Sequence, residues 1–477
     1  MVAPFDNVPT ILAAFGATGD LMRRKVIPAL YHLFEKQALP TMFCVVGFSR
    51  RDLTDETFGD FVVATISEHW NREFSKHELA DFLRLFRFQR GDFNESESYG
   101  ALKQTFDTLD KEWGVCSNKL FYLSIAPEFY ETVFRQIAIA RLSEPCAPGG
   151  GWMRVMVEKP FGVDTTTARE LDQLLGQYFE EQQIYRIDHY LAKEMLQNIL
   201  TFRFSNNLFE MQWGNTLIES IRISMLEEIG VEKRGAFYDS VGAFRDVGQN
   251  HFLQILALLT MGHPESFDAS VIQKKRAEIL ACLPSLSEKD IRHSTIRAQY
   301  DGYRAIEGVD PQSTTETFFR VSTQLDHPRW RGVPIIMEGG KRLGAAQKEI
   351  VVTFRHPQPC LCPPESPHHR NEVIIRLEPR EEILIEFWSK TPGFSFATER
   401  REFHYMLREP SAHVPYVEEY AKLLLDGIRG DQTLFVSTDE VRAMWRFTDP
   451  ILAAWQNGEP PLMMYTPDTK DILEQAQ

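Results

Sequence analysis

The sequence predicts an α/β domain over residues 1–187, followed by an α+β domain over residues 188–477 with a large, mostly antiparallel sheet. In the first part, apolar runs alternate with amphipathic segments, a pattern typical of a parallel sheet flanked by helices. In the second part, several strand-like runs follow one another, which favours antiparallel pairing. A chain of 477 residues is long enough for domains that each bury a core.

The expected elements of the first domain begin at the N-terminus. Apolar runs predict strands at residues 10–15, 42–48, 119–124 and 153–157, the last preceded by a glycine run at residues 149–151. Residues 20–35 are predicted to form a helix, because most of their apolar side chains fall on one face at helical spacing. The alternation of strand and helix is that of a parallel sheet.

The character of the chain changes near residue 188. A helix is expected at residues 190–202, and strands at residues 217–225, 316–325, 349–354, 373–377 and 383–387. Further helices are expected at residues 243–259, 416–428 and 438–455. We find neither an internal repeat nor a long low-complexity linker, so two domains account for the chain.

Composition narrows the classes of partner. Hydrophobic residues make up 43% and charged residues 25%, as in ordinary globular proteins, and the formal net charge is −15. Nucleic acid is not expected as a partner, because phosphate backbones are bound by clustered Lys and Arg. A small anionic substrate remains possible, since the field inside a pocket can oppose the charge of the surface.

Targeting and redox features point to a cytoplasmic protein. The first ten residues lack a basic segment, and the longest apolar stretch, residues 252–261, is interrupted by Gln254 and is too short to span a membrane. The six cysteines are scattered, which does not resemble a disulfide framework and favours a reducing compartment.

One Pro-rich stretch concentrates thiols and imidazoles. Cys360 and Cys362 lie close to His356, His368 and His369, so a zinc site could be drawn from them. The spacing matches no standard zinc pattern, however. A solvated loop that happens to carry thiols is the simpler interpretation, and no metal is predicted.

A glycine-containing turn follows the first predicted strand and opens directly into the helix. Glycines there let the backbone approach a pyrophosphate, whose charge then lies at a helix N-terminus, as in a Rossmann-like domain. The pattern is imperfect because Ala14 stands at the first glycine position, and a tight turn without a ligand remains an alternative. The residues of the turn are Gly16, Ala17, Thr18, Gly19, Asp20 and Leu21.

The end of the second predicted strand indicates which dinucleotide is bound. Arg50 and Arg51 stand where an NAD enzyme would usually carry an acidic residue for the ribose 2′-hydroxyl. Two guanidinium groups suit the 2′-phosphate of NADP, and Lys25 on the first helix adds a possible contact. Solvated arginines in a loop are the alternative. NADP is the predicted cofactor.

Longer blocks of sequence resemble the glucose-6-phosphate dehydrogenase family over nearly the whole chain. The blocks are GATGDLMRRKVIPALYHL from Gly16, VEKPFG from Val157, RIDHYLAKE from Arg186, FRDVGQNHFLQ from Phe244, WRGVPIIMEGGKRL from Trp330 and DEVRAMWRF from Asp439. The resemblance implies oxidation of C1 of D-glucose 6-phosphate to 6-phospho-D-glucono-1,5-lactone with NADP, the first oxidative step of the pentose phosphate pathway. It also implies a homodimer or homotetramer formed through the sheet of the second domain.

The resemblance assigns the reacting groups residue by residue. It makes His251 the general base for the C1 hydroxyl and Asp188 its partner, which fits a histidine that titrates near working pH and is held by a carboxylate. On an expected helix, His189 and Lys193 would share a face, with Tyr190 nearby, and would gather around an anion. It also implies a cis bond before Pro160. The other implied substrate contacts are Lys159, Glu227, Asp246 and Lys341, and the other implied cofactor contacts are Ser124, Pro127 and again Lys159.

One position departs from the family. Many members carry a second basic residue about five positions after the one matching Lys341, and Ala346 stands there, although Lys348 or Arg342 could substitute. This leaves open a paralogue that acts on a hexose with a different C6 group. A non-catalytic NADP-binding subunit is a further alternative, which the presence of all the proposed reacting groups disfavours.

Overall fold

The computed structural model describes residues 9–146, 150–360, 362, 369–395, 397–407 and 418–475. The chain forms two compact units. The first comprises Met1–Ala192, Asp268–Gln273 and Tyr416–Thr438, and the second comprises Lys193–Phe267, Lys274–Pro415 and Asp439–Gln477. Gly149, His368 and the start of the helix expected at residue 416 lie outside the described residues.

The first unit is built on a twisted sheet of seven strands among the described residues, in the order β15-β6-β5-β4-β1-β2-β3. Strands β1 to β6 pair in parallel, and β15 is antiparallel to β6. The strand order reverses between β1 and β4, which marks the ligand-binding switch point of a dinucleotide-binding domain. The strands are β1 (Thr10–Phe15), β2 (Phe43–Ser49), β3 (Phe86–Arg90), β4 (Asn118–Leu123), β5 (Met153–Glu158), β6 (Ile184–Ile187) and β15 (Phe435–Val436).

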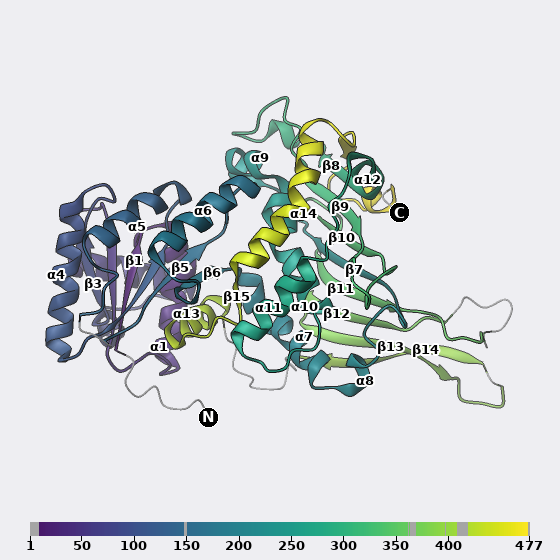
Figure 1. Cartoon of the computed structure of the whole chain (residues 1–477), viewed down its shortest axis with the longest axis horizontal. Helices are drawn as coiled ribbons and strands as arrows, with labels where there is room; N and C mark the ends of the chain where they lie inside the picture. The colour runs from purple at the N-terminus through teal and green to yellow at the C-terminus, as the bar shows by residue number, and fades with distance from the viewer. Residues whose placement is uncertain are drawn as a thin grey trace. The chain divides into compact units, whose positions relative to one another are not determined.

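Helices lie on both faces of this sheet (Figure 1). All six residues of β1 are buried, which explains why its sequence is continuously apolar rather than alternating. The helices are η1 (Met22–Val26, π-helical), α1 (Ile27–Glu35), α2 (Asp55–His69), α3 (Ala80–Leu83), α4 (Ser96–Trp113), η2 (Pro127–Phe129), α5 (Tyr130–Ile139), α6 (Thr165–Tyr178), η3 (Glu181–Gln183), η4 (His189–Ala192) and α13 (Glu419–Arg429).

The second unit is built on a sheet of nine strands among its described residues, in the order β14-β13-β12-β11-β7-β10-β9-β8-β16. Only β7 with β10 and β8 with β16 pair in parallel, so the predicted mostly antiparallel sheet is confirmed. The strands are β7 (Ile218–Leu226), β8 (Thr295–Tyr300), β9 (Phe318–Thr323), β10 (Ile335–Gly340), β11 (Gln347–Phe354), β12 (Glu372–Glu378), β13 (Glu382–Lys390), β14 (Thr398–Met406) and β16 (Met463–Tyr465).

The helices of the second unit include α7, α10 and α14, which lie beside its sheet in Figure 1. Helix α10 is buried at every residue, so its hydrophobic sequence has no polar face. The helices are α7 (Glu194–Phe204), α8 (Asn207–Glu210), η5 (Glu232–Arg234), α9 (Gly235–Ala243), η6 (Phe244–Phe252, π-helical), α10 (Leu253–Thr260), α11 (Ala269–Leu280, which begins in the first unit), α12 (Glu288–Ser294), η7 (Tyr303–Ala305), α14 (Thr438–Gln456) and α15 (Asp471–Gln475).

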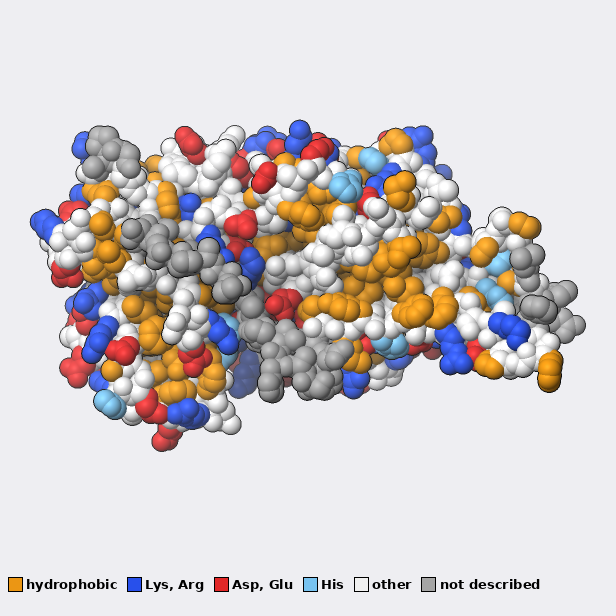
Figure 2. All heavy atoms as spheres, turned by 90° about the horizontal axis from the view of Figure 1, so that it is seen from below, with side chains coloured by type: hydrophobic (Ala, Val, Ile, Leu, Met, Phe, Trp, Pro, Cys, Tyr) orange, Lys and Arg blue, Asp and Glu red, His pale blue; other side chains and the backbone are white. Residues whose placement is uncertain are grey.

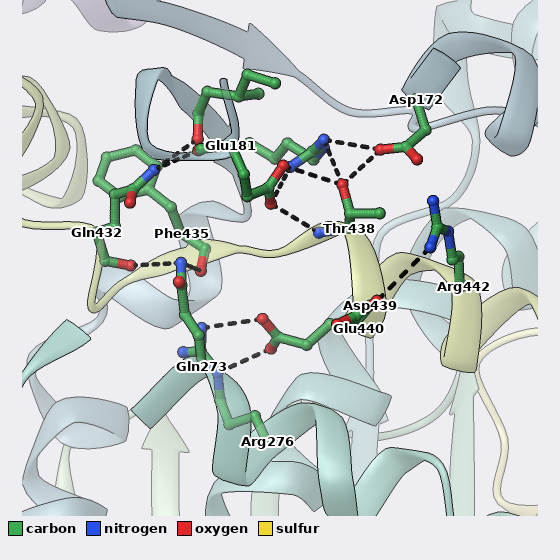
Figure 3. Close-up of polar contacts among 12 residues, drawn as sticks. Asp172, Glu181, Gln273, Arg276, Gln432, Phe435, Thr438, Asp439, Glu440 and Arg442 are labelled. Atoms are coloured by element: carbon green, nitrogen blue, oxygen red, sulfur yellow. Dashed lines mark hydrogen bonds and ion pairs between the residues drawn. The ribbon is translucent and has the colours of Figure 1, made fainter. Parts of the chain in front are cut away.

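In the first unit, a buried ionic cluster binds the late segment that ends at Thr438 to the earlier strand β6 (Figure 3). Arg186 of β6 is 3% exposed and pairs with Asp172 at 3.1 Å and Glu181 at 2.8 Å. Its guanidinium also donates to Oγ1 of Thr438, at 2.7 Å. Removing one partner of such a buried pair typically costs about 3–5 kcal/mol. This cluster fixes β15 and the residue that begins α14.

Two further contacts in Figure 3 fix segments that are distant in the sequence. In the first unit, the side-chain amide of Gln273 donates to the carbonyl oxygens of Gln432 and Phe435, at 3.0 and 3.2 Å. In the second unit, Arg276 and Glu440 form a fully buried ion pair at 2.8 Å. Segments from the second half of the chain therefore complete both units.

Acidic and basic side chains are interspersed on the face drawn in Figure 2. Within the described residues, no helix has the length and apolarity needed to cross a bilayer.

Cys116 and Cys146 are joined as a disulfide with a Cα–Cα distance of 5.8 Å. The sequence did not predict this bridge, because the two residues are 30 positions apart and match no spacing pattern.

Candidate active site

The turn after β1 has the backbone conformation that close approach to a ligand requires. Gly16 has a φ of +78°, and a Cβ added there would lie 2.3 Å from the carbonyl oxygen of Ser124. Its amide donates to Phe48 O of β2 at 3.0 Å, and the amide of Gly19 donates to Gly16 O at 2.8 Å. A side chain at position 16 would therefore be both strained and obstructed.

Ser124 lies directly after β4, at the switch point opposite this turn. Its Oγ is buried and has no hydrogen-bond partner among the described residues. A Cβ added at Gly19 would lie about 4.0 Å from that Oγ. An unsatisfied hydroxyl beside a glycine turn fits the backbone and pyrophosphate of a dinucleotide. The residues present therefore match the predicted cofactor.

The end of β2 carries the two arginines. Ser49 links the strand to the turn, because its Oγ lies 3.3 Å from Thr18 Oγ1 and accepts from the amide of Arg51 at 3.2 Å. Arg50 and Arg51 are exposed. They stand at the carboxyl edge of the parallel sheet beside the glycine turn, where a ribose 2′-phosphate would be reached.

The remaining residues expected at the cofactor lie around the same turn. Ala17 is buried, and Asp20, in the residues just before η1, pairs with Arg24 at 2.9 Å on the surface. Lys25 is exposed on η1, with its ammonium 5.9 Å from the ring centre of Tyr420. Pro127 begins η2, and Leu21 is the N-terminal flanking residue of η1.

Lys159 follows the carboxyl end of β5, and its peptide bond to Pro160 is cis, as the resemblance implies. The preceding residue, Glu158, was given no role by the sequence. Desolvation raises the pKa of its carboxyl to about 7, although Tyr122 and Tyr420 donate hydrogen bonds to it and oppose that shift. The Tyr122 bond measures 2.6 Å. A buried carboxyl that accepts hydrogen bonds from two tyrosine hydroxyls therefore directly precedes Lys159.

The expected helix over residues 190–202 is interrupted. Residues His189–Ala192 form a 3₁₀ turn whose second residue, Tyr190, donates its amide to Asp188 Oδ1 at 3.0 Å. Lys193 has extended backbone angles and forms the N-cap of α7. The prediction that His189 and Lys193 share one helical face is therefore wrong, because the helical register breaks between them. His189 instead contacts the rings of Tyr190 and Tyr420.

In the second unit, Glu227 and Lys341 come together because two parallel strands end side by side. Leu226 of β7 is aligned with Gly340 of β10, and the next residue of each strand is the functional one. The Glu227 amide donates to Gly340 O at 2.9 Å, and Lys341 Nζ lies 2.5 Å from Glu227 Oε2. The strand register therefore places these two residues side by side, and their side chains form an ion pair.

Lys348 extends this pair into a cluster of three lysines and two carboxylates. Its Nζ lies 3.6 Å from Glu227 Oε1 and 3.0 Å from Glu378 Oε2. Lys193 Nζ lies 3.5 Å from the other oxygen of Glu378. All three lysine side chains are less than one-fifth exposed. We call Lys193, Lys341, Lys348, Glu227 and Glu378 the lysine cluster; it carries one net positive charge.

Arg342 and Lys348, the two residues that could replace the basic side chain expected at position 346, differ in their surroundings. Arg342 has a φ of +51°, and its Nε donates to Asp468 at 2.8 Å in an exposed pair. Ala346 is itself exposed. Lys348, on β11, shares carboxylates with Lys193 and Lys341 instead.

Asp246 and His251 lie on η6, a π-helical segment. Such segments are rare and often occur at functional sites. A kink at Gly242, with a φ of +74°, precedes η6. Glu316 holds the kink, because its Oε1 accepts from the Phe244 amide at 2.9 Å. His251 is 1% exposed. Asp188 belongs to the first unit, so its pairing with His251 stays a prediction.

Tyr238 is a candidate that the sequence did not indicate. Its hydroxyl is buried without a hydrogen-bond partner among the described residues, and Lys341 Nζ lies 5.6 Å from its ring centre. Desolvation, and then the charge of Asp246, raise the pKa of Tyr238 well above its usual value. A neutral hydroxyl donor thus belongs to a ring near Lys341, an expected substrate contact. Its place in the FYDS run of α9 carried no recognisable signal.

Comparison with known proteins agrees with this arrangement. Residues 13–198 match the family described as glucose-6-phosphate dehydrogenase, NAD binding domain, and residues 200–475 match its C-terminal domain. The chain is 38% identical over 475 residues to glucose-6-phosphate 1-dehydrogenase of Treponema pallidum, covering 96% of this chain and 91% of that protein. It is 38% identical over 455 residues to that of Aggregatibacter actinomycetemcomitans, covering 92% and 90%.

Solved structures give the same result. A glucose-6-phosphate dehydrogenase in complex with its substrate glucose 6-phosphate is 31% identical, with a TM-score of 0.89 over 100% of this chain and 98% of that one. The enzyme of Mycobacterium avium is 30% identical, with a TM-score of 0.82 over 96% and 94%. The predicted Rossmann-like first domain and sheet-based second domain are confirmed. The chain belongs to the glucose-6-phosphate dehydrogenase family.

Proposed function

We propose that this protein is an NADP-dependent glucose-6-phosphate dehydrogenase that oxidises C1 of D-glucose 6-phosphate to 6-phospho-D-glucono-1,5-lactone. The family match supports the activity. The lysine cluster is the observation that supports glucose 6-phosphate as the substrate. It supplies positive charge for the 6-phosphate, although Ala346 has no basic side chain. Neither a paralogue for a different C6 group nor a non-catalytic subunit is favoured.

His251 is the proposed general base. It takes the proton of the C1 hydroxyl while the hydrogen on C1 leaves as hydride, so that a C1–O double bond forms. Bound NADP supplies the hydride acceptor. Burial of His251 keeps the imidazole away from bulk water, and Asp188 is its predicted partner in fixing the tautomer and stabilising the imidazolium.

The proposed cofactor contacts surround the carboxyl edge of the first sheet. Gly16, Ala17 and Gly19 allow the pyrophosphate to approach the backbone, and the Ser124 hydroxyl gains a partner. Arg50 takes the 2′-phosphate. The other proposed contacts are Thr18, Asp20, Leu21, Lys25, Pro127 and Lys159.

The proposed substrate contacts divide by the chemistry of the sugar phosphate. Lys193 and Lys348 bind the phosphate, together with His189 and Tyr190. Glu227 and Asp246 accept hydrogen bonds from sugar hydroxyls, which discriminates among sugars because a hydroxyl in another position cannot make these bonds. Lys341, Lys159 and the Tyr238 hydroxyl donate to the sugar oxygens.

The activity test is the absorbance of reduced nicotinamide with purified protein. We expect turnover with glucose 6-phosphate and NADP, a lower kcat/KM with NAD, and a much lower kcat/KM with unphosphorylated glucose. A folded protein with no turnover above the blank would reject the function. Equal kcat/KM for glucose and glucose 6-phosphate would reject the phosphate assignment alone.

Three finer assignments go with this function. We propose that the reaction is the first oxidative step of the pentose phosphate pathway, and that the protein is a cytoplasmic homodimer or homotetramer. The family resemblance supports association through the second sheet, on which a hollow of about 550 Å³ lies over strands β7, β10 and β11. Light scattering on the protein as it elutes from a gel-filtration column measures the oligomeric state. A reducing cytoplasm would open the Cys116–Cys146 bridge, which thiol alkylation in fresh lysate detects.

A further inference from the structure

The connection between β11 and β12 brings three metal-ligand side chains together. One nitrogen of His356 and the sulfur atoms of Cys360 and Cys362 all lie within 4.8 Å of one another. The distance from His356 Nε2 to Cys362 Sγ is 3.8 Å. In a tetrahedral zinc site, the usual Zn–S and Zn–N bonds place such atoms about 3.6 Å apart. Small side-chain rotations would therefore complete the geometry.

Surrounding contacts orient these groups as a metal site requires. His356 Nδ1 lies 2.8 Å from the carbonyl oxygen of His369, which can only accept a hydrogen bond. Nδ1 therefore carries the proton, and the lone pair of Nε2 is left on the side of Cys362. A backbone carbonyl that fixes the imidazole in this way is the usual support of a zinc-bound histidine.

His369 supports the sulfur as well. Its backbone amide donates to Cys362 Sγ at 3.4 Å, which stabilises a thiolate. Its own ring is engaged elsewhere, stacked on Trp388 of β13 with ring centres 3.8 Å apart and with Nε2 3.4 Å from Thr398 Oγ1. His369 thus acts as a support for the ligands and anchors them to the sheet.

We propose that His356, Cys360 and Cys362 bind one Zn²⁺ ion, with water as the fourth ligand. Two thiolates and an imidazole form a donor set suited to zinc rather than to Mg²⁺ or Ca²⁺. The ion would link Cys360 and Cys362 to His356, and the supporting His369 contacts β13 and β14. The sequence spacing concealed this site, because Cys-x-Cys with a histidine four residues earlier matches no standard zinc motif.

The test uses the full-length protein, kept reduced, loaded with Zn²⁺, freed of excess metal by gel filtration and analysed by elemental mass spectrometry. We expect about one zinc per chain for the natural protein and a background level for the Cys360→Ser/Cys362→Ser double variant. Cys282→Ser is the matched control, because Cys282 is another free cysteine outside the site, and it should keep its zinc. His356→Ala should release zinc to a chelator faster than the natural protein.

Two further measurements test the ligands of the bound metal and the folding of the variants. Co²⁺ loaded in place of zinc should give the intense visible and near-ultraviolet absorption of tetrahedral thiolate ligation, and the double variant should lack it. Dehydrogenase activity should be unchanged in every variant, which shows that each is folded. Zinc at background in the natural protein, zinc retained in the double variant, or preferential binding of Cu⁺ would each overturn the assignment.

Discussion

Lys348 and Lys193 share one carboxylate, Glu378, whose two oxygens lie 3.0 and 3.5 Å from their respective ammonium groups. One lysine comes from β11 and the other from the N-cap of α7. Glu227 links Lys348 in turn to Lys341. The antiparallel register places Lys348 beside Met225, near the end of β7. We propose that Lys348 supplies the positive charge that Ala346, two residues earlier, cannot.

Lys348→Ala should raise the KM for glucose 6-phosphate by roughly 10- to 100-fold, with a smaller fall in kcat, because a hydrogen bond to a charged group contributes about 1.5–3 kcal/mol. Turnover of unphosphorylated glucose should be unchanged. Arg342→Ala is the matched control and should leave both substrates unaffected, since its guanidinium pairs with Asp468. If Arg342→Ala raises the KM and Lys348→Ala does not, the phosphate is bound elsewhere.

Part of the fold could be predicted, because several buried strands have continuously apolar sequences. The strand predicted at residues 10–15 matches β1, and residues 153–157 match β5 to within one residue. Seven strands were not predicted: β3, β6, β8, β10, β14, β15 and β16. Of these, β3 and β14 are edge strands with exposed, charged side chains. Strands β6, β8 and β10 lie inside their sheets and are largely buried, so burial alone did not make every strand recognisable. The pairing of these strands depends on the strands next to them in the sheet, so it cannot be predicted from the local sequence.

The site could be predicted only where residues follow recognisable blocks. Glu227 and Lys341 were expected as separate contacts, but their ion pair depends on the alignment of β7 with β10, which are far apart in the chain. Tyr238 gave no signal, because an unsatisfied hydroxyl is visible only when its surroundings are known. The helical face expected for His189 and Lys193 failed because periodicity does not reveal an N-cap inside an apolar segment.

Tyr238→Phe should raise the KM for glucose 6-phosphate by roughly 2- to 10-fold without loss of stability. The hydroxyl lacks a partner in the protein, so its removal relieves a desolvation cost, while a donor to the sugar is lost. Tyr303→Phe is the contrasting control, because the Tyr303 hydroxyl donates to Asp239 at 2.9 Å. It should lower the Tm and leave KM unchanged. A lower Tm and an unchanged KM for Tyr238→Phe would contradict the assignment.

His251→Asn should lower kcat by about 10²- to 10⁴-fold and leave the affinity for NADP, measured by fluorescence titration, unchanged. An amide of similar size keeps the packing but cannot accept the C1 proton. His293→Asn, on exposed α12, controls for loss of a histidine and should retain full activity. A rate within a few-fold of the natural protein would remove His251 from the role of base.

Glu158 should make the protein less stable as the pH rises. Its pKa is raised in the folded state to about 7, from about 4.5, chiefly by desolvation. Between these values the folded protein keeps a proton that the unfolded chain has released, so stability falls through this window by about 3 kcal/mol. Glu158→Gln carries no titrating proton, and its Tm should fall less than that of the natural protein between pH 5 and pH 8. Glu131→Gln, at an exposed position of α5, should keep the natural pH dependence. Parallel Tm curves for all three proteins would show that the Glu158 carboxyl is ionised throughout.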